Sequence, residues 1–229
     1  MTLESPALSI FSIIKFALAA WLFSRTLPHR GEGPLRSTVA MILVVALIAG
    51  SAMFGFSMFP TLTDDLSLFV AVLTFTGELL VAVLIQRIVY DCPMLTSVFC
   101  CSMAYSLENL SSATERIFSQ YVPYSQMPPL VLEASLRCWG ITIAVYLIAY
   151  PLLVKRVEKT GLLQISDPIM VLVAVLVIVV NMVLDLIVKD LAVPSLGVPS
   201  HDANTLGIVY LLLCVYIMYS VFEIVYNRR

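Results

Sequence analysis

The chain has 229 residues, a formal net charge of −2, and 60% hydrophobic residues against 12% charged residues. Soluble globular domains carry roughly 25% charged residues, so the composition argues against one, and the small net charge gives no sign of nucleic-acid binding. Apolar runs such as PIMVLVAVLVIVVNMVLDLIV do not alternate with polar residues, which excludes the pattern of barrel strands and favours helices. We therefore expect an all-α fold, a polytopic membrane helix bundle.

Seven stretches approach the roughly 20 apolar residues that a transmembrane helix needs. Lys15 interrupts the first stretch and Glu78 interrupts the third. The connections between the stretches are short, so we expect one transmembrane domain over residues 1–229. The seven predicted spans are residues 6–27, 37–59, 66–85, 96–118, 130–154, 168–188 and 205–226.

Basic residues between these stretches predict their orientation. They gather after the first, third and fifth spans and at the end of the chain, and basic residues accumulate on the cytoplasmic side of a membrane. We therefore expect seven transmembrane helices in a multi-pass membrane protein, with the N-terminus outside, the C-terminus cytoplasmic and lipid as a partner. The basic residues are Arg25, Arg30, Arg36, Arg87, Lys155, Arg156, Lys159, Arg228 and Arg229.

The fourth stretch, TSVFCCSMAYSLENLSSATERIF, is unusually polar. On a helix, Tyr105, Glu108 and Ser112 share one face, whereas Met103 and Leu107 lie on an apolar stripe that we expect to face lipid. A charge at mid-bilayer costs at least about 2.5–3.5 kcal/mol, so the polar face should meet other helices or a wet cavity. Possible partners in other spans are Lys15, Arg137, Asn181 and Asp185.

Two roles remain open for this polar face. Its groups either form interhelical hydrogen bonds that hold the bundle together, or they bind a ligand or ion. Glu115 and Arg116 favour anchoring at an interface, and Glu133 with Arg137 has the spacing of a structural ion pair. The candidates for ligand binding or signalling are Tyr105, Glu108, Asn109, Ser112, Asn181 and Asp185.

The last predicted helix carries a polar stripe of its own. Tyr219, Glu223 and Tyr226 recur at helical spacing, shortly before Arg228 and Arg229. The tyrosines are either interface anchors or part of a helix-packing seam. In the second case this helix would relay a signal out of the bundle.

No motif points to catalysis. The sequence has no HExxH, GxSxG or P-loop pattern, and its two histidines lie in predicted loops. The five cysteines form no CxxC pair, and most of them fall in apolar helices, where cysteine behaves as a small hydrophobe. We expect no enzyme activity in this chain, no catalytic residue, no cofactor and no metal site.

Residues 85 to 229 carry a family resemblance. The run Tyr90-Asp91-Cys92, then Phe99 and the segment Tyr105 to Leu110, resembles the membrane sensor region of GHKL-type sensor histidine kinases of the bacterial accessory-gene-regulator kind. The KRVEKTG loop, the Asn181-x-x-Leu184 pattern and the terminal arginines extend the resemblance. The chain departs from that family in lacking a phosphoacceptor box and an ATP-binding domain, and in having Glu108 where glutamine is expected.

The resemblance implies the signal-input module of a two-component system, a receptor in the bacterial plasma membrane. It would sense an extracellular peptide or small molecule and pass the signal through the last helix to a cytoplasmic kinase core and response regulator, as a homodimer. The alternative is a small membrane transporter or substrate-binding subunit, in which Glu108, Asp185 and Lys15 form a path. A third possibility is a scaffold protein without signalling or transport.

Overall fold

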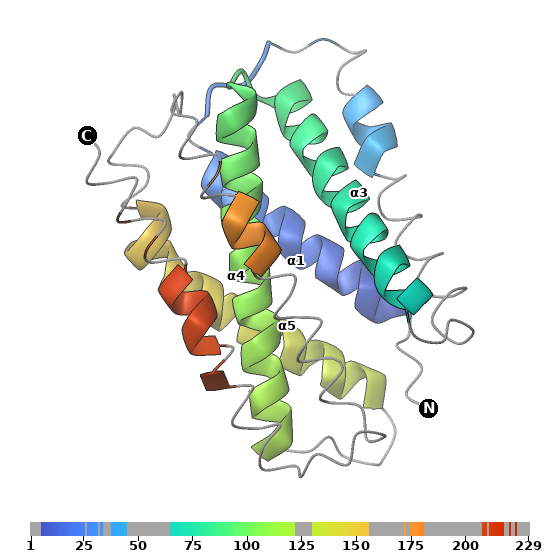
Figure 1. The fold of residues 1–229 in the computed structure, drawn as a ribbon. Coiled ribbons are helices and arrows are strands. Elements are labelled where there is room, and N and C mark those ends of the chain that lie inside the picture. The colour runs from blue at the N-terminus through green and yellow to red at the C-terminus, as the bar shows by residue number, and fades with distance from the viewer. Residues whose placement is uncertain are drawn as a thin grey trace.

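The structure is a computed structural model, and four long helices dominate it (Figure 1). They are α1 (Pro6–Ser24), α3 (Asp65–Val89), α4 (Met94–Tyr121) and α5 (Leu130–Ala149), and α5 runs into a π-helical turn, η1 (Tyr150–Val154). The described residues are helical in these ranges and contain no strand. The structure describes residues 6–25, 27–31, 33, 38–44, 65–121, 130–155, 172, 175–180, 208–209, 211–217, 220 and 223.

Prolines shape two of these elements. Pro6 is the first residue of α1, where a missing N–H costs nothing because the first turn of a helix has no partner for it. Pro151 lies inside η1 and cannot donate a helical hydrogen bond. The chain widens there, and the N–H of Lys155 bonds the carbonyl of Tyr150.

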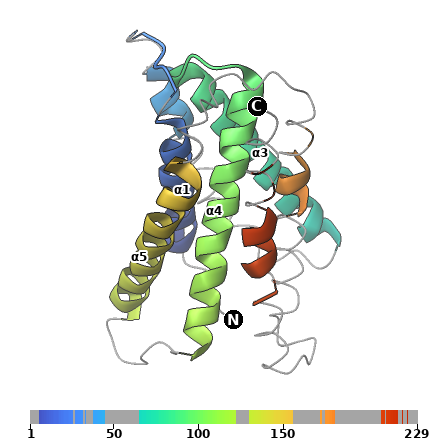
Figure 2. The same ribbon diagram turned by 90° about the vertical axis from the view of Figure 1, so that its left-hand side faces the viewer.

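Helix α4 is the centre of the molecule. It contacts α1, α3 and α5, and Figure 2 shows α1 and α5 on one side of it and the helical segments 175–180 and 211–217 on the other. Every residue from Cys101 to Asn109 is buried, so all faces of this part of α4 are covered. The polar groups of this part of α4 therefore lie inside the bundle.

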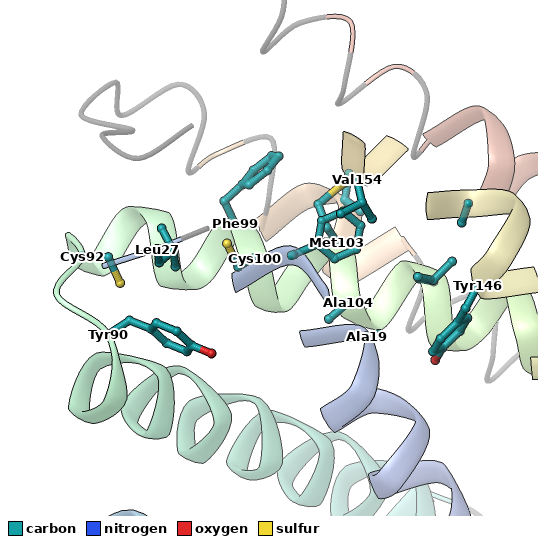
Figure 3. Packing of buried hydrophobic residues seen from close by; sticks show 14 residues of the cluster. Ala19, Leu27, Tyr90, Cys92, Phe99, Cys100, Met103, Ala104, Tyr146 and Val154 are labelled. Atoms are coloured by element: carbon teal, nitrogen blue, oxygen red, sulfur yellow. The ribbon is translucent and has the colours of Figure 1, made fainter. Parts of the chain in front are cut away.

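The main hydrophobic cluster lies around the first half of α4. Phe99, Met103 and Leu107 are at most 2% exposed and pack with residues of α1, α5 and η1. In Figure 3, Ala19 of α1 and Tyr146 of α5 lie close to this row. Burial of such side chains stabilises the fold by roughly 1.5–3 kcal/mol each.

A backbone clasp joins the loop after α1 to the corner between α3 and α4. The amide of Arg30 donates to the carbonyl of Val89, and the amide of Asp91 donates to the carbonyl of Pro28. His29 and Tyr90 form an isolated antiparallel bridge, and their rings lie 4.8 Å apart. This clasp fixes the end of α1 relative to the start of α4.

The structure contradicts the prediction of seven transmembrane helices with the N-terminus outside and the C-terminus cytoplasmic. Within the described ranges, none of the helices combines the length and the apolarity that crossing a membrane requires. Helix α4 has the length, at 28 residues, but serines and the charged Glu108 and Glu115 interrupt its apolar character. The prediction of a multi-pass protein of the bacterial plasma membrane is contradicted by the same finding.

The predicted lipid-facing stripe of α4 is also wrong. Met103 and Leu107 are 0% exposed and belong to the main cluster. Helical spacing correctly separates an apolar from a polar face, but it does not say whether another element covers the apolar one.

Truncation of Met103 tests the central position of α4. Met103→Ala should lower the free energy of unfolding by about 2–5 kcal/mol, because it leaves a cavity in a close-packed core. Met94→Ala on the same helix is the matched control, since Met94 is 53% exposed, and should change stability by at most about 0.5 kcal/mol. Denaturant unfolding of the purified chain measures both, and equal losses would contradict the arrangement.

Candidate functional site

The candidate site is a buried ionic network between α1 and α4. Lys15 of α1 is 4% exposed, and its Nζ donates a hydrogen bond of 3.1 Å to Ser112 Oγ. The same nitrogen lies 3.8 Å from Glu115 Oε2 and 4.0 Å from Glu108 Oε1. One ammonium group is therefore shared among three oxygen-bearing side chains of α4.

Helical spacing brings these three α4 residues together. Glu108, Ser112 and Glu115 follow one another at intervals of four and three residues, which places them on one face. Ser112 links two members directly, since its hydroxyl donates a 2.8 Å hydrogen bond to Glu108 Oε1 while it accepts from Lys15. The side chain of Glu108 is 8% exposed and that of Glu115 is 20% exposed, so the network opens towards Glu115.

Helix α5 supports the network from a second side. Tyr146 donates a 2.9 Å hydrogen bond to the backbone carbonyl of Lys15, and Thr142 exchanges a 2.8 Å hydrogen bond with Ser111. Thr142 also donates to the carbonyl of Cys138. The three α5 residues recur every fourth position and form one polar stripe facing α1 and α4.

This environment perturbs the titration of the α5 stripe. Burial raises the pKa of the Tyr146 phenol far above its ordinary value, and the nearby Glu108 carboxylate raises it further. Burial also raises the pKa of the Cys138 thiol, an effect that the positive charge of Lys15 partly opposes. Tyr146 and Cys138 therefore stay protonated at neutral pH and serve as hydrogen-bonding groups.

Asn109 lies next to the network and contains an unused donor. It is 3% exposed, and its Nδ2 has no hydrogen-bond partner among the residues that the structure describes. A buried donor without a partner costs about 1–3 kcal/mol. Asn109 directly follows Glu108 in the chain, so its side chain leaves α4 about 100° further round the helix, on the neighbouring face.

Two of the predicted ligand-binding residues thus share the network, and two others lie beside it. Glu108 and Ser112 bind the Lys15 ammonium group, whereas Tyr105 and Asn109 are buried on the neighbouring face of α4. Asn181 and Asp185 lie outside the described residues. In the predicted relay helix, Glu223 is helical and half-buried, and Tyr219 and Tyr226 lie outside the described residues.

Sequence reasoning missed the contribution of α5. Glu115 was interpreted as an interface anchor and binds Lys15 instead. The spacing of Cys138, Thr142 and Tyr146 is a signal that could have revealed the polar stripe. Taken one at a time, each of these residues is compatible with an apolar helix, so the stripe was not predicted. The predicted pair of Arg137 with Glu133 stays a prediction, because the side chain of Glu133 lies outside the described part of the structure. The guanidinium of Arg137 lies 5.6 Å from the ring centre of Phe118.

A second buried group of side chains lies near the clasp. Gln86 donates a 2.6 Å hydrogen bond to Ser24, and Cys92 is 3.2 Å from the hydroxyl of Ser97. Burial, with a smaller contribution from Cys92, raises the pKa of the neighbouring Cys100 thiol to about 12. None of the five cysteines forms a disulfide and all of them are buried, so none of them is poised as a nucleophile.

The groups of the site can exchange hydrogen bonds and share charge. The described residues contain no group of three or more histidine, cysteine or acidic side chains that could hold a metal ion. Lys15, Glu108 and Glu115 together can hold a positive charge inside the bundle. Comparisons with protein-family models, curated proteins and solved structures find no match to this chain.

Removal of the lysine charge tests the network. Lys15→Met should lower the free energy of unfolding by about 3–5 kcal/mol, because it leaves carboxylates buried without their cation. The double variant Lys15→Met/Glu108→Gln should recover part of this loss, since it removes a buried negative charge as well. Denaturant unfolding measures each step.

The exposed pair between Arg30 and Asp91 provides the control. Its N···O distance is 3.1 Å, but the two side chains are 38% and 65% exposed. Asp91→Asn should therefore change stability by at most about 1 kcal/mol. A Lys15→Met variant no less stable than Asp91→Asn would contradict the buried network.

Thiol labelling tests the burial of the cysteines. At pH 8 a maleimide should label none of the five cysteines in the folded chain, because each is buried and the Cys100 thiol is protonated below pH about 12. Unfolding in denaturant should expose all five. Mass spectrometry counts the adducts, and rapid labelling of the folded chain would contradict the packing around α4.

Proposed function

We propose that this chain is the signal-input module of a two-component sensor histidine kinase. Its bundle would sense a peptide or small molecule and relay the signal through the last helix. The observation that carries the proposal is the buried ammonium group of Lys15, which is shared by Glu108, Ser112 and Glu115. The resemblance of residues 85–229 to GHKL-type sensor regions gives the kinase context.

A network of this kind supports a two-state element. One cation with several acceptors can change partners without being left unpaired, so two arrangements of similar free energy are available to α1 and α4. A ligand that prefers one arrangement shifts the population by its difference in affinity for the two. Tyr146 joins α5 to the same lysine, so three helices would respond together.

A short contact path leads from the network towards the end of the chain. Ser112 belongs to the network, and the next residue, Ala113, is 1% exposed and packs against Cys214 and Leu211. Residues 211–217 are helical and precede Glu223. A shift of α4 would therefore displace the helical segment 211–217 through the contact of Ala113 with Cys214 and Leu211.

The remaining partners of the proposal rest on the resemblance. They are a kinase core, a response regulator and a second copy of the chain in a homodimer. The alternative of a small transporter or substrate-binding subunit stays a prediction, because no contact within the described residues favours it.

A fusion of residues 1–229 to a histidine kinase core tests the proposed function. In this proposal Lys15 and Glu108 set the balance between the two states. Lys15→Arg and Glu108→Gln should therefore change basal autophosphorylation by about fivefold or more, which is the size of effect that typical coupling free energies produce. Autophosphorylation is measured with radiolabelled ATP on equal amounts of folded fusion protein. Asp91→Asn, which alters only an exposed pair, should leave it unchanged.

Thermal unfolding of each fusion separates signalling from simple loss of fold. Fusions that unfold at the wild-type temperature and still differ in autophosphorylation support the proposal. If Lys15→Arg and Glu108→Gln both fold and both give wild-type autophosphorylation, the network does not control output and the proposal is wrong.

A further inference from the structure

Two buried side-chain atoms in the described part of the chain have no hydrogen-bond partner, Asn109 Nδ2 and Gln86 Oε1. The two amides differ in what holds them. Gln86 donates through its Nε2 to Ser24 at 2.6 Å, so one half of that amide is bound. Asn109 is 3% exposed, and its donor nitrogen has lost its hydration without gaining an acceptor among the described residues. This donor therefore disfavours the arrangement of α4 in which it lies.

Asn109 differs in this respect from the polar residues that follow it on α4. Ser111 exchanges a hydrogen bond of 2.8 Å with Thr142. Thr114 donates to the carbonyl of Leu110. Buried polar groups in proteins are nearly always paired, so an exception in the central helix needs an explanation. Stability does not provide one, because an apolar side chain at position 109 would avoid the penalty.

The location of Asn109 connects it to the contact between α4 and the C-terminal helical segment. Asn109 and Ala113 are four residues apart and lie on the same face of α4. Ala113 is 1% exposed and packs against Cys214 and Leu211. Figure 2 shows the segment 211–217 beside α4. A rotation of α4 that moves this segment therefore also changes the surroundings of the Asn109 amide.

We propose that Asn109 is a positioning residue that keeps α4 in balance between two arrangements. Its unpaired donor raises the free energy of the arrangement in the structure, whereas the contacts of Lys15 with Glu108 and Ser112 lower it. A second arrangement that gives the amide an acceptor recovers the missing hydrogen bond and so stays accessible. This inference rests on the proposed function and deepens it, since it names a residue that regulates the two-state element.

Asn109 and the Lys15 contacts act on the same equilibrium with opposite signs. Removal of the Asn109 amide favours the arrangement in the structure, and removal of a Lys15 contact favours the other one. Asn109→Ala and Glu108→Gln should therefore move the output of the kinase fusion in opposite directions, whichever arrangement is the active one. A residue with a merely structural role would not give this relation.

Thermal unfolding of the full-length chain tests the unpaired donor. Asn109→Ala should raise the unfolding midpoint by about 2 °C or more, because it removes a buried donor that has no acceptor. Ser111→Ala is the matched control, since Ser111 is also buried on α4 but is paired with Thr142, and it should lower the midpoint. Alanine improves helix propensity by a similar amount at both positions, so propensity does not explain a difference in sign. Differential scanning fluorimetry measures both variants.

Asn109→Leu is the second variant, because it removes the amide and fills the space that alanine leaves empty. At least one of the two Asn109 variants should be more stable than the wild type. A loss of stability in both would show that the amide has a partner, and the inference would then be wrong.

Autophosphorylation of the fusion of residues 1–229 to a histidine kinase core tests the regulatory role. The more stable Asn109 variant should change basal autophosphorylation by about fivefold, in the direction opposite to that of Lys15→Arg and Glu108→Gln. A change in the same direction as those two variants would contradict a shared equilibrium and overturn the inference.

The two proposals fail separately. Unchanged autophosphorylation in all of these variants would reject the signalling function, even where an Asn109 variant is more stable than the wild type. Changes with Lys15→Arg and Glu108→Gln, together with lower stability of both Asn109 variants, would retain the signalling function and reject the role of Asn109.

Discussion

One buried cation sets the position of α1 on α4. Lys15 is 4% exposed, and a charge in such a place is tolerated only when acceptors compensate for its lost hydration. Lys15, Ala19 and Phe23 recur every fourth residue, and Ala19 and Phe23 are buried in the main cluster. The ion therefore extends the contact of this helix face with α4, and a slip of one helical turn would separate Lys15 from the carboxylates of α4.

The central place of α4 follows from the same constraint. Its polar side chains from Thr96 to Ser111 are buried, so each needs a partner in a neighbouring helix or in its own backbone. Ser112 and Glu108 contact the Lys15 ammonium group, and Ser111 forms a hydrogen bond with Thr142. Thr114 donates to the carbonyl of Leu110. Within the part of the chain that the structure describes, the Asn109 amide nitrogen has no hydrogen-bond acceptor, which distinguishes it from these neighbours.

Local patterns in the sequence predicted part of this arrangement. The helical spacing of Glu108 and Ser112 indicated a shared inward face, and Lys15 was among the partners available to it. The same spacing could not show that Met103 and Leu107 are covered, because periodicity describes one helix and not its neighbours. Apolar composition likewise predicted seven membrane spans, and within the described residues the structure contradicts them.

Contacts between distant segments were beyond such patterns. Arg30 and Asp91 are 61 residues apart, and the two backbone hydrogen bonds of the clasp join residues with no shared motif. The polar stripe of α5 was missed for a different reason. Thr142 and Tyr146 count as mildly polar residues in an apolar helix, and their importance appears only when Ser111 and the Lys15 carbonyl lie opposite them.

Close packing connects the charged network to the far side of α4. Ser112 and Ala113 are adjacent in the chain but face different neighbours, Lys15 on one side and Cys214 on the other. Cys214 is 0% exposed and Ala113 is 1% exposed, so this contact leaves no room for α4 to turn without moving the helical segment that carries Cys214. A rearrangement of the Lys15 contacts that rotates α4 must therefore displace the C-terminal helical segment, because a close-packed interface passes displacement on instead of absorbing it.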